Sequence, residues 1–395
     1  MAAPFTSSKS RRKAPKGLDP ASVHQFVEDV LGDDLHAQRV FSLANGVLGV
    51  LNAASLAIHA IGQGLSVAMG LDPKHAVKQV DRLLSNAGVD VEDLAPYWVS
   101  FVIASRTDVV VAMDWTDFDD DDQTTLVVNV ITEHGRATPL LWKTVPKKGL
   151  KTRRNDYEDD LLERLREAVP DGVQVTVMAD RGFGDQKLYA FLRELGFHYV
   201  IRFRGVIKVT AASGETRPAS GWQRQGGRLV TLQGAGVTAD NTAVERVVIV
   251  RERGMQDTWY LASSRTDLTG PQIKNLYGRR FTIEENLRDT KDLHFGLGLS
   301  ATHITVPARR DRLLLLVAFA EALLTLLGAA AESLGLDKKL KVNTAKKRTH
   351  SLFRQGTYWY SAIPAMREDR LRNLMTAFEN TVKQHAVFRG IFGAI

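Results

Sequence analysis

The sequence predicts a mixed α/β fold that is flanked by helical regions and interrupted by a small β insertion. Apolar residues recur at helical spacing up to about residue 104, short apolar and alternating runs follow from Asp108, and helical spacing returns from Pro271. Such changes of hydrophobic period mark the passage between helices and strands. At 395 residues the chain is long enough for two or three domains of about 150 residues each.

The first 104 residues are predicted to form a basic tail followed by a helical region that binds DNA. Residues 1–17 carry five basic side chains and no acidic one, which is typical of a solvated tail or of an arm that contacts DNA. In residues 18–104, Asp72-Pro73 predicts a helix start, because Asp is a favoured N-cap and proline a favoured first residue. Lys78 and Arg82 of that helix would face either solvent or DNA.

A mixed sheet is predicted within residues 105–204. The predicted strands are Val109–Met113, Leu126–Ile131, Pro139–Lys143, Val173–Ala179 and Tyr199–Phe203, and the predicted helices are Tyr157–Val169 and Gln186–Leu195. A continuous apolar run such as the first strand is typical of a strand buried on both faces. The order of three strands, helix, strand, helix and strand favours a mixed α/β layer.

The rest of the chain divides into a β insertion and two helical parts. Residues 205–262 are rich in Gly and Thr and contain short strand-like runs. Residues 263–335 would complete the core, and residues 336–395 would form a C-terminal helical region that includes the basic stretch Lys338–Arg348, either a solvated linker or a second DNA contact. Leu313–Ala331 has the composition of a membrane span, but Glu321 in its middle favours a buried core helix.

Composition limits the classes of function. The absence of cysteine excludes disulfides, thiolate zinc sites and a cysteine nucleophile, and the histidines form no H-E-x-x-H motif. A net charge of +7 indicates an acidic partner, of which nucleic acid is the commonest. The N-terminal residues lack an apolar signal core, so we expect a cytoplasmic protein rather than a secreted one.

Two aspartates follow the strongest predicted strands. Asp114 comes after V-V-V-A-M and Asp180 after V-T-V-M-A. Ligands of α/β sheets usually bind where strands end, and carboxylates there suit a hard cation such as Mg²⁺. No G-x-x-x-x-G-K-[ST] loop is present, so the phosphate cradle of nucleotide hydrolases is missing. Each aspartate taken alone is equally typical of a turn or cap.

A polar stripe is predicted on a helix near residue 284. Its members are spaced 3, 4, 4 and 3 residues apart: Tyr277, Arg280, Glu284, Arg288 and Lys291. At about 100° per residue they share one face, where Arg and Lys can hold phosphates and Glu284 can hold a metal. The alternative is a salt-bridged surface helix.

Other acidic residues nearby are interpreted as lying outside the predicted metal site. Glu285 points about 100° away from Glu284, so it is the poorer ligand. Asp117 and Asp119–Asp122 are interpreted as a solvated turn, and Asp185 and Asp289 as surface or capping residues.

The spacing Y-x2-R-x3-E-x6-K resembles the signature of insertion-sequence-four family transposases, and D-W-T-D-F and A-D-R-G-F-G-D precede it in the order of that family. The resemblance covers roughly residues 107–300. It implies a ribonuclease-H-like core in which Asp114, Asp180 and Glu284 form a catalytic triad that holds two Mg²⁺ ions, for which Mn²⁺ can substitute. It also implies a homodimer on double-stranded DNA, namely the inverted repeats of the transposon ends and the target.

The resemblance assigns further roles to neighbouring residues. Tyr277, Arg280 and Lys291 would grip phosphates near the cut, and excision would pass through a hairpin on the transposon end. Trp259 would stack against a base flipped out beside the cut, although a Trp packed in a strand is the simpler interpretation. Arg202 and Arg204 alternate onto one face of their strand, where DNA contact and ordinary solvation are equally consistent with the sequence.

These features favour a DNA transposase that works in the cytoplasm on nucleoid DNA. One alternative is a catalytically inactive descendant that binds DNA or represses transposition, and the intact triad and signature argue against it. The other is a structure-selective nuclease with the same core, which the β insertion and the Tyr-Arg-Glu-Lys pattern argue against.

Overall fold

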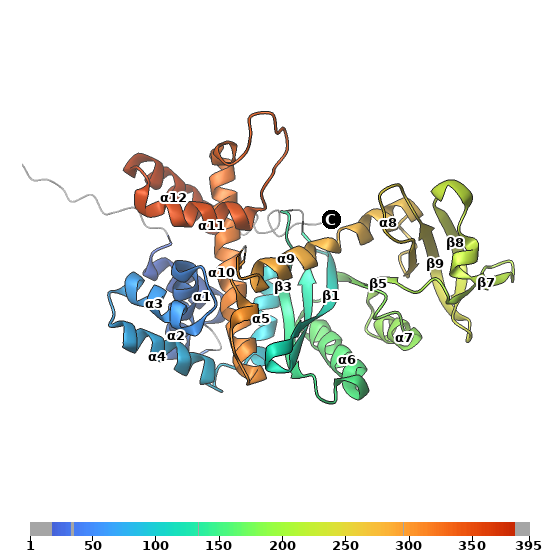
Figure 1. The fold of residues 1–395 in the computed structure, drawn as a ribbon, viewed down its shortest axis with the longest axis horizontal. Helices are drawn as coiled ribbons and strands as arrows, with labels where there is room; N and C mark the ends of the chain where they lie inside the picture. Colours follow the sequence, from blue (N-terminus) through green and yellow to red (C-terminus); the bar gives the residue numbers. More distant parts are fainter. Residues whose placement is uncertain (1–17, 33–34, 133, 295, 384–395) are drawn as a thin grey trace, which may run out of the picture.

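The computed structural model describes residues 18–32, 35–132, 134–294 and 296–383 (Figure 1). The basic tail of residues 1–17 lies outside the described residues. The N-terminal helices are α1 (Pro20–Leu31), α2 (Ala37–Ala53), α3 (Ile58–Met69), α4 (Pro73–Ser85) and α5 (Val91–Ile103). The predicted start of α4 is confirmed, because the Asp72 side chain accepts a hydrogen bond from the His75 backbone N–H and Pro73 opens the helix.

The predicted mixed α/β layer is confirmed in its order of elements. These are β1 (Asp108–Phe118), β2 (Gln123–Val130), β3 (Thr138–Pro146), α6 (Leu150–Ala168), β4 (Gln174–Ala179), α7 (Gln186–Glu194) and β5 (His198–Arg202). The strands lie in the spatial order β3-β2-β1-β4-β5. β4 pairs in parallel with both β1 and β5, and β2 pairs antiparallel with both β1 and β3.

Two elements of this layer are longer than the sequence pattern predicts. The first strand continues past Met113 to Phe118, because β2 pairs with it along the polar W-T-D segment as well. Asp114 therefore lies inside β1 rather than at its end. The helix predicted from Tyr157 begins at Leu150. The prediction missed its first turns because they are polar and show no apolar period.

The β insertion extends this sheet rather than forming a separate layer. Its strands are β6 (Lys208–Thr210), β7 (Thr216–Pro218), β8 (Val230–Val237), β9 (Thr242–Val250) and β10 (Trp259–Ser263). β10 pairs antiparallel with β5 on one side and with β9 on the other. The result is a ten-stranded sheet that runs from the core to the distal strands (Figure 1).

The C-terminal part is helical. It contains α8 (Gly270–Gly278), α9 (Phe281–Lys291), α10 (Pro307–Ser333), α11 (Leu352–Ala362) and α12 (Glu368–Lys383). Helix α10 packs against β3, α2, α4, α11 and α12, with α1–α4 on one side of it and the sheet on the other (Figure 1). α10 is long and apolar enough to cross a membrane, but 89% of its most apolar window is buried inside the protein. The predicted buried core helix is confirmed.

Two predictions about acidic residues are wrong. Asp289 is buried rather than on the surface, and the side chain of Asp121 in the supposed solvated turn is only 5% exposed and pairs with the fully buried Arg310. Each has a basic partner from a distant part of the chain, which compensates the cost of burying its charge. Asp185, by contrast, caps α7 as predicted, since its carboxylate accepts a hydrogen bond from the Lys187 backbone N–H.

Candidate active site

The two predicted catalytic aspartates lie side by side where β4 ends. The parallel pairing of β1 and β4 closes with Met113 opposite Ala179. Asp114 and Asp180 are the next residues of the two chains, so the register places them at the same level of the sheet. Burial is the main cause that raises the pKa of Asp114, and the negative charge of Asp180 raises it further, while Arg280 lowers it.

Backbone hydrogen bonds orient both carboxylates. The Trp115 N–H donates to Asp114 Oδ1 at 2.9 Å, and the Gly182 N–H donates to Asp180 Oδ1 at 2.7 Å. A Cβ at position 182 would come within 2.9 Å of that Asp180 oxygen. A residue larger than glycine would therefore disturb the carboxylate that its own N–H holds.

Arg280 connects this pair of aspartates to Glu284. Its Nη1 lies 3.2 Å from Asp114 Oδ2, and its Nη2 forms an ion pair with Glu284 Oε1. The predicted single helical stripe is interrupted here, because Arg279 and Arg280 form a tightened turn between α8 and α9. The backbone N–H groups of both residues bond three residues back rather than four. Arg280 and Glu284 nevertheless stay in contact, and Arg280 reaches Asp114 of β1.

Tyr277 lies beside Arg280 and contacts the ring of Trp259. Tyr277 is buried, and this burial raises the pKa of its phenol to about 12, although Arg280 and Arg202 nearby favour its charged form. The Trp259 ring meets the Tyr277 ring edge to face, with centroids 5.1 Å apart. Trp259 itself is half-buried in β10.

The other two members of the predicted stripe point to different places. Lys291 donates to Thr116 Oγ1 at 3.1 Å and to the Asp117 carbonyl at 2.7 Å, so it contacts the end of β1. Burial lowers the pKa of Lys291. Arg288 forms an ion pair with Glu285. Glu285 also pairs with Arg136, in agreement with the prediction that it points away from the triad.

The remaining predicted DNA contacts are spread over the molecule. Arg202 is mostly buried, and its Nη2 lies 3.4 Å from Asp257, while Arg204 is exposed just beyond β5. Lys78 and Arg82 are exposed on α4, which lies on the other side of α10 from the sheet (Figure 1). The structure therefore does not bring these two residues to the Asp114 cluster.

The donor set suits a hard cation only in part. Carboxylate oxygens are the ligands that Mg²⁺ prefers, and the close approach of Asp114 and Asp180 is a repulsion that a cation would relieve. Glu284 meets these two through Arg280. Over the described ranges, no group of three or more His, Asp or Glu is arranged to hold a metal ion as it stands. Arg280 must leave its two carboxylates before all three could share an ion.

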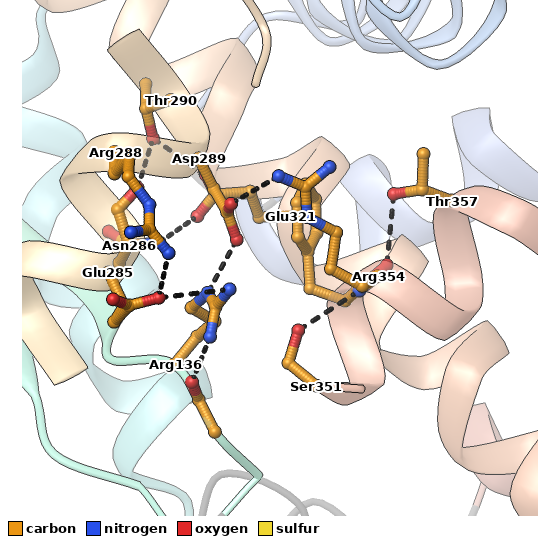
Figure 2. A network of polar contacts seen from close by, with 12 residues as sticks. Arg136, Glu285, Asn286, Arg288, Asp289, Thr290, Glu321, Ser351, Arg354 and Thr357 are labelled. Carbon is orange, nitrogen blue, oxygen red and sulfur yellow. Dashed lines mark hydrogen bonds and ion pairs between the residues drawn. The ribbon is translucent and has the colours of Figure 1, made fainter. Parts of the chain in front are cut away.

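A polar network that was not predicted from the sequence lies on the inner face of α9 (Figure 2). Asp289 Oδ2 lies 2.5 Å from Arg136 Nε, and Asp289 Oδ1 lies 2.7 Å from Arg354 Nη2 of α11. Asn286 and Thr290 donate to the two carboxyl oxygens of Glu321 in α10 at 2.9 and 3.0 Å. The spacing of polar residues at 286, 289 and 290, and the lone Glu321 in an apolar helix, were the signals that could have revealed it.

Residues 143–320 match a family model described as a transposase DDE domain. The matched segment is less than half of the chain. It includes Asp180 and Glu284 but begins after Asp114. The match supports a DDE transposase, which is a DNA-processing enzyme, and it implies a ribonuclease-H-like fold, as the mixed sheet leads one to expect. Enzymes of this class generally use divalent metal ions. The comparison with curated proteins gave no match.

Proposed function

We propose that this protein is a cut-and-paste transposase of the insertion-sequence-four family. It binds the inverted repeats of its element, excises the element by metal-dependent hydrolysis and transesterification through a hairpin, and joins it to target DNA. The observation that carries this proposal is the meeting of Asp114 and Asp180 beneath the Arg280–Glu284 pair. The transposase DDE match over residues 143–320 supports it.

In this proposal Asp114, Asp180 and Glu284 hold two Mg²⁺ ions, or Mn²⁺ in their place. When bound, the ions activate the attacking oxygen and stabilise the leaving 3′ oxygen. Asp114 and Asp180 are already oriented by the N–H groups of Trp115 and Gly182. No side chain becomes covalently attached to DNA, so the protein positions the phosphate and the metal-holding oxygens.

Arg280 exchanges partners in the proposed reaction. It now spans Asp114 and Glu284, and a DNA phosphate offers it the same two-point contact, since guanidinium groups bind phosphates and carboxylates in the same bidentate way. Lys291, now bound to neutral oxygens of β1, would also gain a charged partner. Tyr277 would join them through its hydroxyl, while Arg202, Arg204, Arg288, Lys78 and Arg82 remain candidate contacts farther along the DNA.

The protein would act as a homodimer that holds two transposon ends, in the bacterial cytoplasm and on nucleoid DNA. Its net charge of +7 favours binding to the phosphate backbone. The tight bend of a hairpin requires a nucleotide to leave the stack, and Trp259 beside Tyr277 would receive its base.

The test is a reconstituted reaction. DNA that flanks the gene is inspected for paired inverted repeats, and duplexes carrying these ends are incubated with the protein, Mg²⁺ and a target plasmid. We expect nicking, hairpin formation and strand transfer with these duplexes. None of the three should occur with scrambled ends. Nicking of branched DNA without strand transfer would indicate a structure-selective nuclease, and end binding without cleavage an inactive descendant.

A further inference from the structure

An ion pair of α6 contacts residues next to Asp114 and Asp180 and has no part in the mechanism above. It joins Arg154 and Glu158 of α6, with Arg154 Nε 2.9 Å from Glu158 Oε1. The Glu158 side chain is 8% exposed and that of Arg154 is 39% exposed. Exposed pairs at this helical spacing contribute little, but a buried carboxylate is costly unless several contacts compensate it. The contacts that compensate the burial of Glu158 come from Arg154 and from Trp115, the residue after Asp114.

Both partners contact aromatic residues that adjoin the catalytic aspartates. The Trp115 indole Nε1 donates to Glu158 Oε1 at 2.7 Å, and the Arg154 guanidinium lies 5.5 Å from the centre of the same ring. The guanidinium also lies 5.4 Å from the centre of the Phe183 ring. One ion pair therefore contacts a residue of β1 and a residue of the loop after β4.

These two aromatic residues belong to the segments that orient the catalytic carboxylates. Trp115 gives its backbone N–H to Asp114, and Gly182, directly before Phe183, gives its N–H to Asp180. A Cβ at Gly182 would lie 3.8 Å from Arg154 Nη2, so the guanidinium also borders this loop directly. Neighbouring side chains of a strand point to opposite faces, so Trp115 is held on the α6 face while Asp114 projects toward Arg280.

We propose that the Arg154–Glu158 pair is a positioning unit that sets the spacing and orientation of Asp114 and Asp180. Two carboxylates that repel each other keep a fixed separation only if the segments that carry them are anchored to a common support. Groups that orient metal-holding residues in this way commonly change metal affinity when they are removed. The inference rests on the proposed function, in which the two aspartates hold a catalytic cation.

The experiment measures Mn²⁺ binding to the purified full-length protein by electron paramagnetic resonance. Asp114→Ala and Asp180→Ala first establish that the signal reports these two residues. Arg154→Ala and Glu158→Ala are expected to weaken Mn²⁺ binding by about 10-fold or more, because removal of such outer partners typically costs that much. Glu158→Gln keeps an acceptor for the Trp115 indole and is expected to lie between Glu158→Ala and wild type.

Arg153 provides the matched control. It is the neighbouring arginine of α6, is 62% exposed and pairs with Asp156 at 3.8 Å. Arg153→Ala should leave Mn²⁺ affinity unchanged. Thermal unfolding of every variant separates stability from positioning. If Arg154→Ala lowers the melting temperature but binds Mn²⁺ as wild type does, the pair is a structural contact and the proposal is overturned.

Variants that fail to fold do not end the test, because Arg154→Lys and Glu158→Gln keep the packing and are measured in the same way. Wild-type affinity in both would overturn the positioning role, and weakened affinity in folded protein supports it. If wild type binds no Mn²⁺ through Asp114 and Asp180, the proposed function fails. If it does and Arg154→Ala matches it, only the positioning unit fails.

Discussion

Helix α9 presents two faces whose charges are satisfied in different ways. On the face toward β1, the Glu284 side chain is 45% exposed and pairs with Arg280 four residues earlier. On the inner face, the Asp289 side chain is 1% exposed and lies between Arg136 and Arg354, which come from a turn and from α11 (Figure 2). Contacts of the first kind can be exchanged for a ligand at small cost, whereas a buried carboxylate such as that of Asp289 is costly without its basic partners. The difference shows how the inner face of a helix can be anchored in the core while the opposite face keeps contacts that a ligand can replace.

The largest expected effect concerns Asp114 and Asp180, which lie beside the Arg280–Glu284 pair. Asp114→Ala and Asp180→Ala should abolish Mg²⁺-dependent cleavage of end duplexes and leave their binding nearly intact, because carboxylates do not supply the attraction for phosphates. Cleavage is followed on gels and binding by mobility shift. Asp156→Ala, at an exposed carboxylate of α6, serves as the control. Normal cleavage by either triad variant would remove that residue from the active site.

The second prediction compares two neighbouring glutamates. Glu284→Gln should be inactive in cleavage, whereas Glu285→Gln should retain most activity, because Glu285 faces Arg136 and Arg288 rather than Asp114. Both proteins are assayed with the same end duplex. A dead Glu285→Gln beside an active Glu284→Gln would show that the assignment of the signature to this helix is shifted.

The third prediction addresses the inner face. Asp289→Ala removes the carboxylate that Arg136 and Arg354 share. Because Arg136 keeps its pair with Glu285, we expect the free energy of unfolding to fall by about 2–3 kcal/mol. Glu368→Ala, which breaks an exposed pair with Arg372 on α12, should cost at most about 1 kcal/mol. Urea unfolding measures both. Equal losses would mean that the buried network is no more than a surface contact in energy.

The fourth prediction concerns the pH dependence of stability. Burial raises the pKa of Glu321 from 4.5 to about 7, although Asn286 and Thr290 oppose the shift. The unfolded chain therefore releases this proton first, and the stability that is present below about pH 4.5 falls as the pH rises to about 7. In Glu321→Gln this fall should be smaller by about 3 kcal/mol.

A glutamine at position 321 can keep the network, since its oxygen accepts from Asn286 and its amide donates to the Thr290 hydroxyl. Urea unfolding of both proteins between pH 4.5 and 8 gives the comparison, with the pH range chosen from the pKa shift. Burial also raises the pKa of Asp311 to about 7, so wild type and variant share that contribution and it cancels. Parallel stability curves would show that Glu321 is not the group that titrates.

The smallest effect is expected at Trp259 of β10, whose ring packs against that of Tyr277. Trp259→Ala should slow hairpin formation about 10-fold more than first-strand nicking, because stacking of a base on an aromatic ring is worth about 1–3 kcal/mol. Trp259→Phe should be intermediate. Time courses with end duplexes separate the steps. An equal slowing of all steps together with a lower melting temperature would assign Trp259 to packing against Tyr277.

Local patterns in the sequence were sufficient to predict the order of the core strands and to single out the two aspartates that follow their apolar runs. The register of β1 and β4 that aligns Asp114 with Asp180 was beyond such patterns, although the position of both residues after apolar runs indicated a shared edge. The length of β1 was missed because its polar second half is stabilised by β2 rather than by burial alone.

Contacts between distant parts of the chain could not be predicted. Asp289 was assigned to the surface because its partners, Arg136 and Arg354, are 153 and 65 residues away. No role was predicted for Glu158, whose indole partner Trp115 is 43 residues earlier. Charge and helical spacing show that such residues are polar, but only the packing of the elements shows that they are buried and with whom.

Strand β10 has a consequence for how this protein can change its length during evolution. Pairing with β5 on one side and β9 on the other fixes the register of β10, in which Trp259 lies opposite Val250 of β9. An inserted or deleted residue between Trp259 and Ser263 would turn the indole to the opposite face of the sheet, because side chains alternate along a strand. The turns at residues 211–215 and 238–241 join antiparallel neighbours far from that register. Homologous chains should therefore vary in length at these distal turns and keep β10 constant.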